Sequence, residues 1–305
     1  MNEYTRTDLA CESAGKEDGR LAGCRCSEHR VCGYKVQRIK VETDAASKRL
    51  GKPCGTYLTV ECGRINTHGE ERLAILARLL AGELRGIAKR MTGRELGSDF
   101  GVFVAGLGNA DLTADALGPE TVARLTVTRH LREHEERLYR DLECCALSAL
   151  APGVLGQTGI ETLEILRGAV QATSPDLVLV IDALAARDCD RLAATVQITD
   201  TGITPGSGVA NHRVGIHPET VGVPVLAIGV PTVVDSSTLI YDALQRGGVE
   251  QIDEPLRRVL ENGRSFFVSP KESDLVTSCA ADLLARAIGL AFAGTLHGEG
   301  ETAYF

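Results

Sequence analysis

The stretch Leu-Val-Leu-Val-Ile-Asp, residues 177–182, decides the expected fold. Its first five residues are all apolar, which is typical of a parallel strand buried on both faces. Asp182 follows at once, so we expect the strand to end at Ile181 and the carboxylate to be exposed at the sheet edge. Because parallel strands need helical crossovers, the stretch predicts an α/β protein.

Strand-like and helix-like segments alternate on both sides of this stretch. The other strands expected after residue 100 are 101–105, 146–150, 194–199 and 223–228. The expected helices begin at Pro119 or cover residues 160–172, 235–245 and 272–292. Repeated β-α-β units predict a mostly parallel sheet with helices on both faces.

The chain before residue 100 adds further β segments to this plan. Residues 34–42 and 56–62 are rich in Val, Ile, Thr and Tyr, as strands are. From Leu73 to Met91, apolar residues recur at steps of three and four, which predicts a long amphipathic helix. Residues 1–33 are polar and irregular, so we expect one domain with an N-terminal extension.

Composition excludes two classes of protein. The chain has 305 residues, with 33 Lys and Arg against 41 Asp and Glu, and a formal net charge of −8. Its 44% hydrophobic and 24% charged residues are typical of a globular protein and exclude a mainly disordered one. An acidic chain without a dense basic block argues against direct nucleic acid binding by phosphate neutralisation.

Membrane and export signals are also missing from the sequence. No stretch approaches the roughly 18 uninterrupted apolar residues of a membrane helix. The N-terminus has no apolar core of a secretion signal. We therefore expect a cytoplasmic protein without membrane attachment, whose ten cysteines are reduced.

One cluster of cysteines could bind zinc. Cys24, Cys26, His29 and Cys32 lie close together, and zinc accepts all four as ligands. Their spacing is not that of a zinc finger, and the flanking residues are charged. A solvated loop with incidental thiols is the expected interpretation, and no metal is expected.

Three loops follow the carboxyl ends of expected strands, where open α/β sheets place their ligand sites. They cover residues 106–119, 151–162 and 180–187. The glycines of the first loop suggest a dinucleotide site, but GLGNAD is not G-x-G-x-x-G and no acidic residue closes a second strand about 20 positions on. No cofactor is therefore expected.

Two carboxylates in these loops are the stronger signal. Asp182 ends one strand, and Asp115 lies in the loop after a neighbouring strand. Each has an ordinary alternative role, helix capping for Asp115 and strand-end solvation for Asp182. If the two converge, one retains a proton while the other acts as a base, which is what activating water against an amide requires.

Other nucleophiles and bases are weaker candidates. The sequence has no G-x-S-x-G elbow, and Ser207 lies in a Gly-rich stretch that indicates a turn. His130 and His134 have i, i+4 spacing but lack the H-E-x-x-H arrangement, so we expect an exposed helical face.

An ordered series of motifs makes the chain resemble the germination proteases, the spore endopeptidases of endospore-forming bacteria. The motifs are RTDLA at 6–10, the 106–119 loop with TRH at 128–130, the 152–162 loop, residues 181–187, GITPGSGV at 202–209, GVPTVVD at 229–235, and residues 268–272 with Asp274. They span nearly the whole chain and are very specific in combination.

The resemblance implies an atypical aspartic endopeptidase, made as a zymogen in the developing spore. It implies that the substrates are small acid-soluble spore proteins, that the enzyme is a homotetramer, and that it works in the forespore or spore core. The two functional aspartates of the family correspond to Asp115 and Asp182.

Two alternatives remain open at this point. The GLGN loop and the Val-Ile-Asp strand end also resemble hydrogenase-maturation endopeptidases, which have the same expected fold and read a bound metal through two carboxylates and a histidine. Their third ligand would be His212 or His217 here. A non-enzymatic spore protein is the other alternative.

The N-terminus contains a copy of the motif that the family cleaves. Family substrates are cut within an acidic-apolar-small motif such as Glu-Ile-Ala-Ser-Glu, before the apolar residue. Residues 8–12 read Asp-Leu-Ala-Cys-Glu. We expect residues 1–8 to be a propeptide that is removed by self-cleavage between Asp8 and Leu9, leaving a single α/β peptidase domain at 9–305. The segment is expected to be mobile, the alternative being an ordinary solvated terminus.

Overall fold

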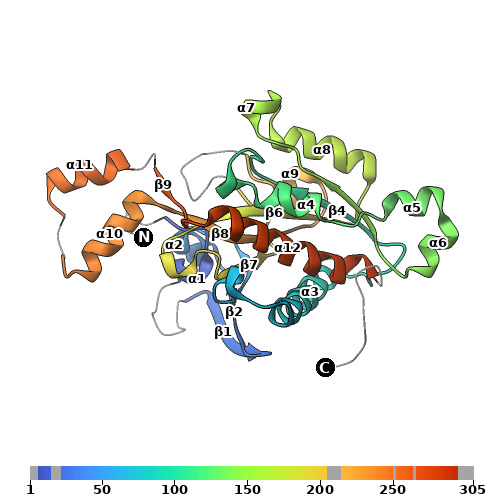
Figure 1. The fold of residues 1–305 in the computed structure, drawn as a ribbon, viewed down its shortest axis with the longest axis horizontal. Coiled ribbons are helices and arrows are strands. Elements are labelled where there is room, and N and C mark those ends of the chain that lie inside the picture. The colour runs from blue at the N-terminus through green and yellow to red at the C-terminus, as the bar shows by residue number, and fades with distance from the viewer. Residues whose placement is uncertain (1–5, 15–21, 205–213, 250–251, 264–265, 295–305) are drawn as a thin grey trace.

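A computed structural model describes residues 6–14, 22–204, 214–249, 252–263 and 266–294. These residues form one sheet of nine strands flanked by helices (Figure 1). The strand order is β1 (Cys24–Val31), β2 (Tyr34–Val41), β3 (Gly55–Glu61), β7 (Thr195–Thr199), β8 (Val225–Asp235), β6 (Leu177–Ala186), β4 (Gly101–Gly106) and β5 (Ala146–Leu150), with β9 (Phe267–Val268) paired to β8.

The sheet has a parallel part and an antiparallel part. Strands β8, β6, β4 and β5 run parallel to one another. The N-terminal strands β1, β2 and β3 are antiparallel, and they join the parallel part through β7, which is antiparallel to both β3 and β8. The expected α/β class with added N-terminal β segments is confirmed.

Helices cover both faces of the sheet. One face carries α3 (Glu70–Thr92), α12 (Ser273–Phe292) and the start of α4 (Leu117–Ala123). The other face carries α8 (Thr162–Thr173) and α9 (Pro218–Val221), with α1 (Ala10–Ser13) and α2 (Asp44–Leu50) further along. The remaining helices are α5 (Arg129–His134), α6 (Glu136–Asp141), α7 (Leu155–Thr158), α10 (Ser236–Arg246) and α11 (Glu254–Gly263), with short 3-10 turns η1 (Ile65–Thr67), η2 (Thr113–Asp115) and η3 (Cys189–Arg191).

The central strand β6 joins the two layers of core. Leu177, Leu179 and Ile181 point into the cluster under α3 and α12. Val178 and Val180 point into the cluster under α8 and α9. This alternation explains the unbroken apolar run, because both faces of the strand are buried.

The end of β6 was predicted wrongly. The strand does not stop at Ile181 but continues to Ala186, because β8 runs beside it until Ala186 meets Val234. Asp182 therefore lies inside the strand, and it is 7% exposed rather than open to solvent. Asp182 interrupts the apolar run, whereas the pairing with β8 continues past it to Ala186.

The expectation of an irregular segment over residues 1–33 was also wrong. Residues 24–31 form β1, a strand whose side chains are almost all exposed. It carried no apolar signal because it is held mainly by its pairing with β2, and only its end residues Cys24 and Val31 pack against the core. Cys24 and Cys26 share one face of β1, whereas alternation turns His29 to the other face. Among the residues that the structure describes, no three His, Cys, Asp or Glu side chains are grouped as a metal ion needs.

Helix α12 is long and apolar enough to cross a membrane by length and composition alone. In the structure it lies along α3 with 67% of its most apolar window buried inside the protein. A core helix accounts for the same composition.

We predict that Leu284→Ala lowers the free energy of unfolding by about 2–5 kcal/mol, because Leu284 on α12 is fully buried and its loss leaves a cavity. The matched control is Leu275→Ala on the same helix, where the side chain is 49% exposed. The control should change the free energy by less than about 0.5 kcal/mol. Urea denaturation checks both values, and equal effects would contradict this packing of α12.

Candidate active site

Asp182 is a carboxylate between two apolar clusters. Val180 before it belongs to the cluster under α8 and α9, and Leu184 after it belongs to the cluster with α1 and α2. Its Oδ1 accepts the main-chain N–H of Ala183 at 3.0 Å. Burying a carboxylate among apolar groups is costly, and such positions are enriched in functional sites.

Gly229 on β8 is the register partner of Asp182. A Cβ at this position would lie 2.6 Å from the main-chain oxygen of Asp182 and 2.7 Å from Cγ of Leu184, so a side chain does not fit. Gly229 lines a cavity of about 130 Å³ to which Asp8, Lys52 and Gln197 also contribute. The cavity therefore reaches the register partner of Asp182 on β8.

Asp115 lies on η2, in the loop after β4. The loop folds back so tightly that a Cβ on Gly108, whose φ is +114°, would lie 1.9 Å from the main-chain oxygen of Asp115. The Oδ2 of Asp115 accepts the N–H of Asn109 at 2.7 Å. The N-cap of α4 is Ala116, so Asp115 shapes its own loop and does not cap the helix.

The structure brings the elements that carry the two aspartates together. Leu107 donates its N–H to the carbonyl of Ile181 at 2.8 Å, which extends the β4–β6 pairing up to the residue before Asp182. The Thr232 hydroxyl of β8 donates to the carbonyl of Ala114 at 2.6 Å. As a result η2 contacts both β6 and β8. Asp115 follows the carboxyl end of β4, whereas Asp182 lies inside β6, and the convergence of their side chains stays a prediction.

The second expected loop also reaches this edge. Gln157 on α7 donates from its Nε2 to Asn109 Oδ1 at 2.9 Å and to Asp111 Oδ2 at 2.8 Å. The loops after β4 and β5 are therefore linked beside Asp115. The third segment, 180–187, is the outer half of β6 and not a loop.

The N-terminal segment lies along the outer half of β6. Because β4 ends at Gly106, β6 has lost one neighbour beyond Ile181. Asp8 takes its place: its N–H donates to the carbonyl of Ala185 at 2.8 Å, and its Oδ2 accepts the Ala185 N–H at 2.8 Å. The chain terminus thus completes the edge of the sheet.

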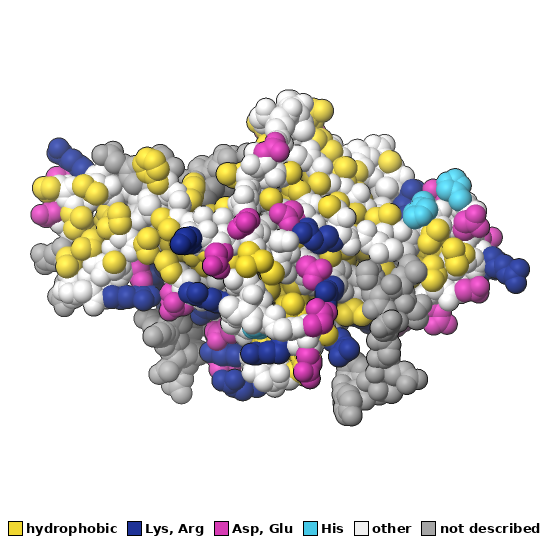
Figure 2. Space-filling view, in the orientation of Figure 1, with side chains coloured by type: hydrophobic (Ala, Val, Ile, Leu, Met, Phe, Trp, Pro, Cys, Tyr) yellow, Lys and Arg dark blue, Asp and Glu magenta, His cyan; other side chains and the backbone are white. Residues whose placement is uncertain are grey.

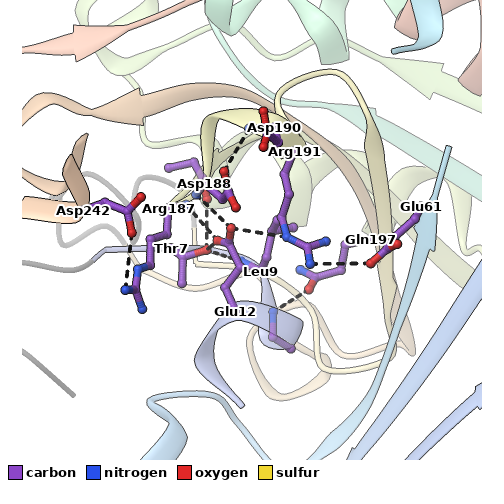
Figure 3. A network of polar contacts seen from close by, with 12 residues as sticks. Thr7, Leu9, Glu12, Glu61, Arg187, Asp188, Asp190, Arg191, Gln197 and Asp242 are labelled. Carbon is purple, nitrogen blue, oxygen red and sulfur yellow. Dashed lines mark hydrogen bonds and ion pairs between the residues drawn. The ribbon is translucent and has the colours of Figure 1, made fainter. Parts of the chain in front are cut away.

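Glu12 holds the other end of the segment (Figure 3). Its carboxylate accepts the N–H of Arg187 at 2.8 Å and of Asp188 at 2.9 Å, and it also accepts the hydroxyl of Thr7. Arg191 lies 3.5 Å from the same carboxylate. Leu9 between these anchors is 0% exposed. The expectation of a mobile segment was therefore wrong for residues 6–13; residues 1–5 lie outside the described residues.

Lys52 and Gln197 bind the main chain of this segment, and the sequence had not indicated either of them. Lys52 Nζ and Gln197 Nε2 each lie 3.0 Å from the carbonyl oxygen of Asp8. Burial lowers the pKa of the Lys52 ammonium, although the charges of Asp8 and Glu12 oppose this shift. The only local signal for Gln197 was an amide inside the β-branched strand Thr195–Thr199.

The structure describes some of the histidines considered from the sequence, and it does not describe the serine. His217 lines the cavity, and its Nδ1 lies 2.9 Å from the carbonyl oxygen of Thr201. His130 and His134 are exposed on α5, as expected. Ser207 and His212 lie outside the described residues.

Several known proteins are similar in sequence to this chain over most of its length. The family model for germination protease matches residues 5–246. The germination protease of Caldanaerobacter subterraneus subsp. tengcongensis is 40% identical, over 94% of this chain and 93% of that protein. The germination protease of Priestia megaterium is 37% identical, over 90% of this chain and 78% of that protein.

A solved structure gives a weaker match. The [NiFe] hydrogenase maturation protease HycI from Thermococcus kodakarensis KOD1 is 18% identical, with a TM-score of 0.35, and the match covers 66% of this chain and 98% of that chain. The family model and the relatives at 37–40% identity agree with the motifs along the sequence. The chain belongs to the germination protease family.

Proposed function

We propose that this chain is an endopeptidase that begins the degradation of small acid-soluble spore proteins during spore germination. Its family supports the class of reaction. The observation that carries the proposal is the position of residues 8–12. This copy of the acidic-apolar-small motif lies along β6 and is bound at Ala185, three residues beyond Asp182.

Asp115 and Asp182 are the proposed catalytic pair. In this mechanism one carboxylate removes a proton from water, and the other, which holds a proton, donates it to the leaving nitrogen. The contact between η2, which carries Asp115, and β6, which carries Asp182, supports the assignment. The burial of Asp182 also supports the catalytic assignment, since a carboxylate at a solvated strand end would be surrounded by bulk water.

The enzyme is proposed to be a zymogen in which residues 1–8 are the propeptide and residues 9–305 the peptidase domain. Asp8 occupies the main-chain groups of Ala185 on the unpaired edge of β6, so another peptide cannot bind there until Asp8 leaves. Asp8 and Glu12 hold the segment through their carboxylates. Mild acid is the proposed trigger, because protonating carboxylates alters both these contacts and the catalytic pair.

The assembly is proposed to be a homotetramer in the cytoplasm of the forespore or spore core, without a cofactor. Apolar side chains gather on the end of the molecule that carries α10, α11 and β9 (Figure 2). They include Val259, Phe266, Phe267 and Val268, which are 38–67% exposed. An exposed apolar surface of this kind supports contacts between subunits.

Asp115→Asn and Asp182→Asn should each lower the rate of cleavage of a peptide containing Glu-Ile-Ala-Ser-Glu by roughly 100- to 10,000-fold, because each variant removes one partner of the proton transfer. Asp141→Asn on α6 is the matched control and should cleave like the wild type. Mass spectrometry measures the cleavage and circular dichroism checks the fold. Wild-type activity in either folded variant would refute the catalytic pair.

Chelation with EDTA should leave the cleavage rate unchanged, since two carboxylates can transfer protons without a Lewis acid. The rate is measured on the same peptide before and after chelation. If chelation abolished cleavage and zinc or nickel restored it, metal-free proton transfer by the aspartate pair would be refuted. The alternative in which two carboxylates and His212 or His217 bind a metal would replace it.

Incubation in mild acid should remove residues 1–8 from the wild-type chain by cutting the Asp8–Leu9 bond. The mass of the intact protein reports this loss, and Asp141→Asn should lose the same segment. The Asp182→Asn chain should stay at full length. If the Asp182→Asn chain were cut, another protease would be responsible for the cleavage. If the wild-type chain stayed at full length and still cleaved substrate well, residues 1–8 would not be a propeptide.

A further inference from the structure

The carbonyl oxygen of Asp8 is bound by two side chains from distant parts of the sequence. Lys52, which follows the left-handed C-cap Gly51 of α2, donates from Nζ at 3.0 Å. Gln197, in the middle of β7, donates from Nε2 at 3.0 Å. This carbonyl belongs to the bond that the proposed self-cleavage cuts, so the two donors meet at the atom where that reaction develops negative charge.

Gln197 also binds the main chain on the other side of Leu9. Its Oε1 accepts the N–H of Ala10 at 2.8 Å, while its Nε2 binds the Asp8 carbonyl. One amide therefore fixes the main chain before and after Leu9. Lys52 adds a second contact, to the carbonyl of Thr7 at 3.0 Å. These contacts use main-chain atoms of Thr7, Asp8 and Ala10, and Ala10 is the first residue of α1, so they do not depend on the side chains of the bound segment.

The sheet places this carbonyl on the same side as Asp182. Gln197 pairs in register with Gly229, and Gly229 pairs with Asp182. Residues in register on adjacent strands point to the same face, and strands lie about 4.8 Å apart. The main chains of Gln197 and Asp182 are thus roughly 10 Å apart on one face, with only a glycine between them.

The Gln197 side chain reaches the segment that is bound to β6. Asp8 binds Ala185 on β6 through its N–H and the amide of Gln197 through its carbonyl. The cavity of about 130 Å³ lies at the same place, with Asp8, Lys52, Gln197 and Gly229 in its wall. The bound carbonyl therefore lies at a cavity that Gly229, the register partner of Asp182, also lines.

We propose that Lys52 and Gln197 form the oxyanion site of this peptidase. This inference rests on the proposed endopeptidase function. When water adds to the carbonyl carbon, the C=O π electron pair moves to the oxygen, and the proton of the water passes to one aspartate. The Lys52 ammonium and the Gln197 amide stabilise the resulting oxyanion. On collapse the C–N bond breaks, and the amine takes its proton from the other aspartate.

The environment of Lys52 suits this role. Burial lowers the pKa of its ammonium, which means that the charge is poorly solvated. Asp8, Glu12 and Cys11 are the titratable groups that oppose this shift. Fixed donors in a site that excludes water stabilise a developing charge more strongly than donors in solvent do.

Two variants test the oxyanion site in the full chain after acid incubation. Gln197→Glu keeps an acceptor for the main-chain N–H but replaces the amide donor with a carboxylate oxygen. Lys52→Met keeps the length of the side chain and removes the ammonium. The controls are Gln245→Glu on α10 and Lys89→Met on α3, which carry the same changes at exposed or partly exposed positions away from the cavity.

Each test variant should lower kcat on the Glu-Ile-Ala-Ser-Glu peptide by about 100- to 1,000-fold with a KM within a few-fold of wild type, as loss of one oxyanion donor does. Lys52→Arg should recover part of the kcat lost in Lys52→Met. Both controls should match the wild type. Circular dichroism checks that each variant folds.

A second measurement does not depend on turnover. A phosphinic peptide of the same sequence carries a charged oxygen at the position of the oxyanion, and its inhibition constant should rise in the folded Gln197→Glu variant, where the carboxylate repels it. Because this variant is isosteric, it serves even if Lys52→Met fails to fold.

Three outcomes would overturn the oxyanion site, and they can be told apart. Wild-type kcat in the folded variants would mean that the two side chains only anchor the terminus. A raised KM with unchanged kcat would mean that they bind substrate and transition state equally. A wild-type chain that cuts no peptide would refute the endopeptidase function itself, and the oxyanion site with it.

Discussion

The outer half of β6 must satisfy its main-chain N–H groups without a neighbouring strand on one side. β4 ends at Gly106, and an unsatisfied buried N–H costs about 1–3 kcal/mol. Carboxylates accept hydrogen bonds from these N–H groups instead. Asp182 binds the N–H of its own neighbour, Asp8 binds the N–H of Ala185, and Glu12 binds the N–H groups of the two residues that follow the strand. The acidic groups therefore complete the sheet at the place where the proposed chemistry occurs.

Glycines set how closely the loops approach this strand. A Cβ on Gly106 would lie 2.3 Å from the carbonyl oxygen of Gly118, so α4 can lie directly over the end of β4. Gly108 permits the loop after β4 to fold back onto Asp115. Gly229 permits β8 to approach the main chain of Asp182 closely. A side chain at any of these positions would push apart main-chain segments that must touch, and the two aspartates with them.

The N-terminal segment has both a structural and a ligand-like role. Leu9 is as buried as the central core residues, yet polar contacts hold its neighbours at Lys52, Gln197 and Ala185. Contacts to main-chain atoms stabilise the folded chain and would also bind a substrate. In the proposed zymogen, therefore, the groups that close the fold and the groups that recognise a peptide are the same.

The sequence by itself determined the elements whose burial leaves a local pattern. The apolar strand Ala146–Leu150, the start of β6 and the helix over Leu73 and Met91 were predicted within a few residues, because burial on one or two faces imposes a fixed period on neighbouring residues. Asp115 and Asp182 stood out for the same reason, as carboxylates next to such patterns. Tertiary structure alone decided the extension of β6, the exposed strand β1, the docking of Leu9 and the meeting of Lys52 with Gln197. Each of these depends on pairing between residues far apart in the chain, and local periodicity carries no information about such pairing.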